Sequence, residues 1–273
     1  MSHLRRLDNM FARLKEAKEM AVMPYLQCGY PDIDTTLELM KALEIAGADA
    51  LELGVAFSDP VADGVTIQQA SHKALQNGVT LDQCINVVQI ARRKLGVRMP
   101  ILLMSYYNVF LAKGLAETAH QLKEADADGL IVPDLPPEES RELRTALSKA
   151  DLCLIPFMAP TTTDERMCKI ATSAEGFIYC VSVTGVTGAR DELSQELSPF
   201  LKRAREHTSV PLVVGFGISN AAHVTQLRGL ADGVITASAL IQLMDSACAE
   251  TRIESVGRFV AELKQASRAF QTS

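Results

Sequence analysis

Short apolar runs alternate with longer amphipathic stretches along almost the whole chain. The opening stretch predicts an amphipathic helix, because apolar side chains recur at helical spacing at Leu4, Leu7, Met10, Phe11 and Leu14. Eight short apolar runs follow, at residues 21–26, 50–53, 101–104, 129–132, 152–157, 177–181, 211–214 and 233–235. Helical periodicity follows each run, near residues 33–46, within 65–95, and near 112–124, 137–150, 164–173, 192–207, 219–227, 238–248 and 254–270.

The eight runs are apolar at successive positions, which is typical of parallel strands buried on both faces. Eight strand–helix units in 273 residues favour an α/β fold of the (β/α)8 TIM-barrel class, with an extra N-terminal helix. No linker rich in Pro, Gly or Ser divides the chain, so we expect residues 1–273 to form a single TIM-barrel domain. The alternative is a doubly wound nucleotide-binding fold, but the nearest match to its G-x-G-x-x-G fingerprint, at residues 215–220, lacks the third glycine.

The composition is that of a globular protein and narrows the choice of partners. An excess of 33 acidic over 27 basic side chains gives a net charge of −6, which disfavours nucleic acid as a partner. No apolar run approaches the about 20 residues of a membrane span, and residues 1–20 lack the features of a secretory signal. The six cysteines stand singly, without a C-x-x-C pair, and indicate neither a disulfide framework nor a zinc site. We therefore expect a cytoplasmic protein that does not contact a membrane.

Carboxylates dominate the segments that follow the predicted strands, which is where barrel enzymes carry their chemistry. The segment after the second strand contains Glu52, Asp59 and Asp63. Burial of Glu52 in an apolar strand would raise its pKa, so that it could accept and donate a proton near neutral pH; pairing with an amide or an arginine is the structural alternative. Asp63 either reaches the same mouth or caps the helix that begins near Val65. No histidine or lysine falls at a predicted strand end, which disfavours Schiff-base chemistry and histidine-ligated metal.

Small residues follow the sixth, seventh and eighth strands, near the starts of the next helices. They are Gly188, Gly217 and the pair Ala237 and Ser238. Backbone amides in such positions bind phosphate in many barrels, while ordinary turn formation is the alternative. Several of these segments at consecutive strand ends favour a site for an anionic group.

Distinctive motifs run along the length of the chain. They are LELGVAFSDPVADG at residues 51–64 with TIQ at 66–68, PY at 24–25, GYP at 29–31, YYN at 106–108, VPDLP at 132–136, GVTG at 185–188 and GFGI at 215–218. Together these motifs resemble the α subunits of tryptophan synthase, and the motif at residues 51–64 is highly specific.

The resemblance implies a carbon–carbon lyase of tryptophan biosynthesis that cleaves indole-3-glycerol phosphate reversibly, by a retro-aldol reaction, to indole and glyceraldehyde-3-phosphate. It implies that Glu52 is the general acid/base at the indole C3 and the glycerol hydroxyl, and that Asp63 pairs with the indole N–H. It also implies that no metal and no organic cofactor is needed. The expected partner is a pyridoxal-phosphate-bearing β subunit, in an α2β2 heterotetramer.

The resemblance further implies which groups hold the substrate. The phosphate would be bound by the amides of Gly188, Gly217, Ala237 and Ser238. The rest of the substrate would contact Tyr25, Tyr179, Thr187 and Phe216. The chain departs from the family pattern at four positions: proline is usual at Ala56 and Val65, threonine at Gln27, and glycine at Ala237. The Cβ atom of Ala237 is tolerated only if φ is negative there.

Two other functions remain open on the residues alone. A barrel could use Glu52, Asp59, Asp63 and Asp134 to bind Mg²⁺ for a different phosphosugar reaction. Alternatively, the chain could be a non-catalytic binding subunit that activates a partner enzyme.

Overall fold

The computed structural model describes residues 5–181, 193–215 and 217–268. Within these residues, nine parallel strands form one sheet in the order β5-β4-β3-β2-β1-β9-β8-β7-β6. The strands are β1 (Ala21–Gln27), β2 (Leu51–Gly54), β3 (Ile101–Met104), β4 (Gly129–Ile131), β5 (Cys153–Ile155), β6 (Phe157–Met158), β7 (Ile178–Val181), β8 (Leu212–Gly215) and β9 (Gly233–Thr236).

The sheet closes on itself through a single short segment of chain. Its two outermost strands, β5 and β6, are consecutive in sequence and are separated only by Pro156. Proline has no N–H to donate to a ladder, but the carbonyl oxygen of Pro156 still accepts from the N–H of Tyr179, at 2.9 Å. The eight predicted strands are therefore found, the fifth divided at its proline, and the predicted TIM barrel is confirmed.

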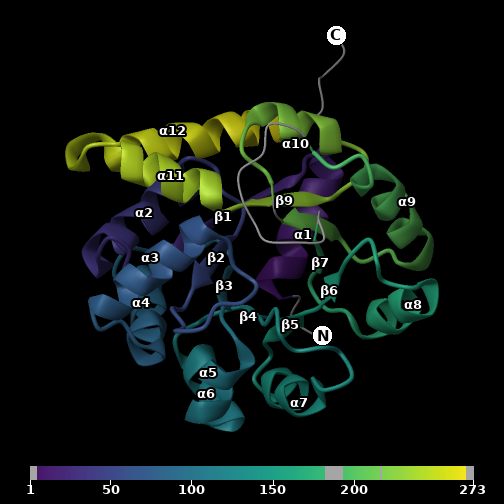
Figure 1. The fold of residues 1–273 in the computed structure, drawn as a ribbon, viewed down its shortest axis with the longest axis horizontal. Coiled ribbons are helices and arrows are strands. Elements are labelled where there is room, and N and C mark those ends of the chain that lie inside the picture. Colours follow the sequence, from purple (N-terminus) through teal and green to yellow (C-terminus); the bar gives the residue numbers. More distant parts are fainter. Residues whose placement is uncertain (1–4, 182–192, 216, 269–273) are drawn as a thin grey trace.

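Helices surround the ring of strands (Figure 1). They are α1 (Arg6–Ala17), α2 (Ile33–Ile45), α3 (Val65–Gln76), α4 (Leu81–Arg93), α5 (Tyr107–Lys113), α6 (Leu115–Glu124), α7 (Arg141–Lys149), α8 (Asp164–Ser173), α9 (Leu197–His207), α10 (Ala221–Leu227), α11 (Ser238–Ser246) and α12 (Ala249–Ser267). The stretch predicted at 112–124 contains two helices, because Gly114, with φ 96°, ends α5 and precedes α6. The stretch 65–95 is divided at Thr80, whose side chain begins α4 by a capping box with Gln83.

The predicted N-terminal helix closes one end of the barrel. Its buried face is formed by Leu7, Met10, Phe11 and Leu14, which join the same apolar cluster as the inward-facing side chains of the strands. Because these side chains meet residues near the amino ends of the strands, α1 covers the amino end of the barrel (Figure 1). The carboxyl ends, where the predicted functional residues lie, form the opposite mouth.

Ion pairs to the buried carboxylate of Asp49 hold α1 and α12 at the amino end. Asp49 lies just before β2. Its carboxylate accepts from Arg13 of α1 at 3.0 Å and from Lys264 of α12 at 2.8 Å. It also accepts from the backbone N–H of Val22 at 3.0 Å. Only the pair with Lys264 is buried on both sides. Removing one partner of such a pair typically costs about 3–5 kcal/mol, because the remaining charge stays desolvated. Asp49 therefore requires Lys264 of α12 beside it.

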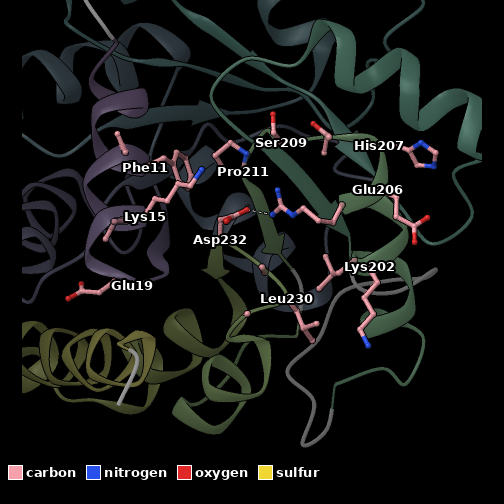
Figure 2. A pocket seen from close by; sticks show the side chains of 17 residues that line it. Phe11, Lys15, Glu19, Lys202, Glu206, His207, Ser209, Pro211, Leu230 and Asp232 are labelled. Atoms are coloured by element: carbon pink, nitrogen blue, oxygen red, sulfur yellow. Dashed lines mark hydrogen bonds and ion pairs between the residues drawn. The ribbon is translucent and has the colours of Figure 1, made fainter. Parts of the chain in front are cut away.

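A cavity of about 1020 Å³ also opens at this amino end. Figure 2 shows it between Phe11 and Lys15 of α1, the last turns of α9, and the segments before β8 and β9. An ion pair between Arg205 and Asp232 crosses its floor. None of the carboxylates proposed from the sequence lines it.

No helix in the described part of the chain combines the length and the apolar composition that a membrane span requires.

Candidate active site

Glu52 is buried inside the mouth of the barrel. It lies on β2 directly opposite Tyr25 of β1, and only 2% of its surface is exposed. Its Oε2 atom has no hydrogen-bond partner within the described part of the chain. Burial, and then the negative charge of Asp63, raise the pKa of Glu52 from 4.5 to about 8. The side chain can therefore hold a proton at neutral pH and give it up to a substrate.

Asp63 is brought to the same mouth by the loop that follows β2. The hydroxyl of Tyr106, in the loop after β3, accepts from the N–H of Ala62 at 2.8 Å and donates to Asp63 Oδ2 at 3.2 Å. Gln68 of α3 donates to the carbonyl oxygen of Asp63 at 2.8 Å. Asp63 is 6% exposed, and burial raises its pKa from 3.8 to about 6, while the Tyr106 hydrogen bond opposes this rise.

The helix-cap alternative for Asp63 is wrong. The N-cap of α3 is Gly64, and no side chain caps that helix. The carboxylate is instead held by the hydroxyl of Tyr106, and its negative charge raises the pKa of Glu52.

Two buried tyrosines, Tyr25 of β1 and Tyr179 of β7, border the carboxylates. Burial raises the pKa of each phenol well above 10, and the charges of Glu52 and Asp63 raise it further. Each ring lies directly against a glycine on the next strand. A Cβ atom at Gly54 would lie 2.0 Å from the Tyr25 hydroxyl, and one at Gly215 would lie 2.1 Å from the Tyr179 ring. The glycines at the ends of β2 and β8 therefore make the room that the two phenols occupy.

The segments after β8 and β9 lie together at the mouth, between the strands that carry Tyr25 and Tyr179. The hydroxyl of Thr236, the last residue of β9, donates to the carbonyl oxygen of Ile218 at 2.9 Å and so fixes the loop after β8 to the start of α11. Gly217 in that loop has φ 83°, a conformation that favours glycine. Ser238 begins α11, whose N-cap Ala237 makes no side-chain cap. Because φ at Ala237 is −124°, its Cβ atom causes no backbone strain.

Three of the residues expected at the site, Thr187, Gly188 and Phe216, lie outside the described residues. The structure therefore describes Glu52, Asp63 and the two tyrosines at the mouth, together with the segments of Gly217, Ala237 and Ser238, which follow β8 and β9, the strands between β1 and β7.

The carboxylates of the magnesium hypothesis do not gather at one point. Asp59 is exposed and accepts from the hydroxyl of its neighbour Ser58. Asp134 is also exposed and accepts from the backbone N–H of Tyr107 at 2.9 Å, which anchors the start of α5. Over the described ranges, no three carboxylate, histidine or cysteine side chains are placed to hold one metal ion. The geometry thus removes the basis of the magnesium site.

Three residues that were not among the predicted site residues support this mouth. Tyr106 binds Asp63, and its position directly after the third apolar run was the available signal. Gln27 is buried and binds both Tyr25 and the carbonyl of Gly54. His223 is 1% exposed, and its Nδ1 atom lies 3.0 Å from the carbonyl oxygen of Gly217. Histidine is thus present behind the loop after β8, although none lies at a strand end.

Comparison with known proteins identifies the family. A model of the family described as "Tryptophan synthase alpha chain" matches residues 11–269. The chain belongs to the tryptophan synthase alpha chain family. The tryptophan synthase alpha chain of Roseiflexus castenholzii is 53% identical over 259 residues, which cover 95% of this chain and 99% of the relative.

Solved structures agree with this membership of the tryptophan synthase alpha chain family. The alpha subunit of tryptophan synthase from Legionella pneumophila superposes with a TM-score of 0.89 at 34% identity, over 97% of this chain and 98% of that one. A chain of Mycobacterium tuberculosis tryptophan synthase gives a TM-score of 0.89 at 32% identity, over 98% and 100% of the two chains. The sequence-based prediction of a carbon–carbon lyase of tryptophan biosynthesis that cleaves indole-3-glycerol phosphate is therefore confirmed.

Proposed function

We propose that Glu52 and Asp63 divide the acid/base work of indole-3-glycerol phosphate cleavage between them. The observation that carries this proposal is the difference between their pKa values, about 8 for Glu52 and about 6 for Asp63. At pH 7 the first is mainly protonated and the second mainly ionised. Two neighbouring carboxyl groups whose environments separate their pKa values can act as an acid and an anion in one site.

In this proposal, Glu52 first donates its proton to C3 of the indole. Protonation makes the ring carbon a leaving group and places positive charge on the ring nitrogen, which the carboxylate of Asp63 stabilises through the indole N–H. The Glu52 carboxylate then removes the proton of the glycerol hydroxyl. The carbon–carbon bond breaks, its electron pair returns to the ring, and the hydroxyl carbon becomes the aldehyde of glyceraldehyde-3-phosphate. Glu52 ends protonated, as it began, so the cycle needs no metal and no organic cofactor.

The phosphate, in the same proposal, binds backbone amides at the mouth. The backbone amides of Gly217, Ala237 and Ser238 would bind it. Gly188, which lies outside the described residues, would provide another amide. What supports this assignment is the uncapped amino end of α11, where the N–H groups and the helix dipole favour an anion. The ring and glycerol portions would contact Tyr25, Tyr179, Thr187 and Phe216.

Paired substitutions test the roles of the two carboxylates. Glu52→Gln and Asp63→Asn should each lower indole release from indole-3-glycerol phosphate by at least about 100-fold, the usual scale of acid/base catalysis. The matched control is Asp59→Asn, an exposed carboxylate in the same loop, which should retain the wild-type rate. In the wild type, kcat/KM should rise with pH near 6 and fall near 8. Wild-type turnover in Glu52→Gln would contradict the mechanism.

We propose a tryptophan synthase β subunit as the partner, in an α2β2 assembly. An alpha chain implies a second kind of chain, and one of the similar solved structures carries the name of the whole enzyme. We expect slow cleavage by the purified chain and faster cleavage after addition of the β subunit. A chain that only accelerates its partner, without cleaving substrate, would support the alternative of an activating subunit instead.

We further propose a cytoplasmic location and a single domain over residues 1–273. Membership of the tryptophan synthase alpha chain family, and a described part of the chain with no helix that could span a membrane, support the first. The inclusion of all described strands in one sheet supports the second. Cell fractionation tests the location, and one cooperative unfolding transition is expected for the domain.

A further inference from the structure

Two neighbouring strands place a tyrosine, a glutamine and the acid/base glutamate on the inner surface of the barrel. In the parallel register of β1 and β2, Tyr25 lies opposite Glu52 and Gln27 lies opposite Gly54. The phenol of Tyr25 rests on Gly54, where even a methyl group would lie 2.0 Å from its oxygen. Its hydroxyl thus reaches the next pair of residues along the strands, beside Gln27.

Gln27 fixes the direction of the Tyr25 hydroxyl. The amide nitrogen of Gln27 donates to the carbonyl oxygen of Gly54 at 3.0 Å, and the amide oxygen lies 2.7 Å from the Tyr25 hydroxyl. A carbonyl oxygen can only accept, so the NH2 group must face Gly54 and the amide oxygen must face Tyr25. The phenol therefore donates its single proton to Gln27. Both side chains are buried, at 3% and 4% exposure, so water does not compete for this proton.

The direction of this proton matters because the phenol lies in the field of both carboxylates. Tyr25 lies opposite Glu52 in the strand register, and the charges of Asp63 and Glu52 raise the pKa of its phenol. Two other tyrosines lie near Tyr25 and the carboxylates. The charge of Glu52 raises the pKa of Tyr179 of β7 more than any other charge does, and Tyr106 already donates to Asp63. Glu52 itself has an oxygen without a donor in the described part of the chain. A phenol proton turned toward that oxygen would stabilise the carboxylate and lower the pKa of Glu52, so that less of it would hold a proton at neutral pH.

We propose that Gln27 is a positioning residue that binds the only hydroxyl proton of Tyr25 and thereby keeps this proton from Oε2 of Glu52, which has no donor in the described part of the chain. Glu52 then retains the proton that it delivers to the indole ring. This inference rests on the proposed function of Glu52. It assigns a role to a buried glutamine whose hydroxyl partner lies on the same strand.

The test uses Gln27→Met, which keeps the length of the side chain and removes both polar atoms. The carbonyl oxygen of Gly54 still accepts from the N–H of Cys28 at 2.9 Å, so no buried carbonyl is left without a donor. The released phenol proton should turn toward Glu52 and lower its pKa. We expect the alkaline limb of kcat/KM to move to lower pH by about one unit, the scale of one hydrogen bond to a charged group. Indole release at pH 8 should then fall about 10-fold relative to pH 6.5.

The double variant Tyr25→Phe/Gln27→Met separates this role from a loss of packing. It lacks the phenol proton, so its alkaline limb should return to the wild-type pH whatever its maximal rate. A direct readout is the carbon-13 NMR titration of the Glu52 carboxyl, assigned by its loss in Glu52→Gln, which does not depend on turnover. An unmoved limb in Gln27→Met, a shift of the acidic limb alone, or an equal shift in the double variant would overturn the inference. Activity in Glu52→Gln, by contrast, would overturn the proposed function first.

Discussion

The burial of Glu52 should make the stability of this protein fall as the pH rises, and Glu52→Gln should remove that dependence. Burial raises the pKa of Glu52 from 4.5 to about 8. Between these values the folded protein holds a proton that the unfolded chain has lost, so each pH unit costs the folded state about 1.4 kcal/mol. The stability that the neutral Glu52 gives the folded state is fully present below pH 4.5 and is lost by pH 8. The difference between 4.5 and 8 corresponds to about 5 kcal/mol.

Urea denaturation at several pH values measures this quantity. The difference in unfolding free energy between Glu52→Gln and the wild type should grow in favour of the variant by about 3 kcal/mol from pH 5 to pH 7. This difference should level off above pH 8, because Glu52 is then ionised in both the folded and the unfolded wild type. Other titrating groups are common to both proteins and largely cancel in the difference.

Glu139→Gln, at an exposed glutamate, provides the matched control. A difference for Glu52→Gln that does not grow between pH 5 and pH 7 would refute the argument that Glu52 is desolvated in the folded protein. The expected gain in stability together with the loss of activity is the usual consequence of a charged group held in an apolar site for function.

Three further outcomes follow from contacts around the mouth. Tyr106→Phe removes the donor to Asp63, so the pKa of Asp63 should rise and the acidic limb of kcat/KM should move up by about one pH unit, measured on indole release. Gly215→Ala should destabilise the fold by about 2 kcal/mol or more in urea denaturation, because its Cβ would collide with the Tyr179 ring at 2.1 Å. Gly257→Ala, where a Cβ meets open space within α12, is its control and should stabilise slightly, by about 0.5–1 kcal/mol. Removal of metal ions with EDTA should leave the rate unchanged, and a loss that Mg²⁺ restores would revive the magnesium hypothesis.

The local sequence determined the strands and most of the helices of this barrel. Runs such as Ile101–Met104 are apolar at every position, which fits only a strand covered on both faces. The N-terminal helix was equally plain, because its four buried side chains recur at helical spacing. The errors are local: the chain breaks at Gly114 and Pro156 were not expected, since a single glycine or proline interrupts a periodic pattern without erasing it.

Only the tertiary structure decided what the acidic segment after β2 does. The sequence left Asp63 open between a helix cap and a partner for Glu52, and the choice depends on Tyr106, which is 43 residues away in the chain. The pKa values of the two carboxyl groups depend on burial, which no local pattern measures. Gln27 likewise gains its meaning from the strand opposite, because a hydrogen bond to Gly54 exists only once β1 and β2 are in register. Chemistry in this protein is set by contacts between residues distant in sequence, whereas the elements that carry those residues follow from their nearest neighbours.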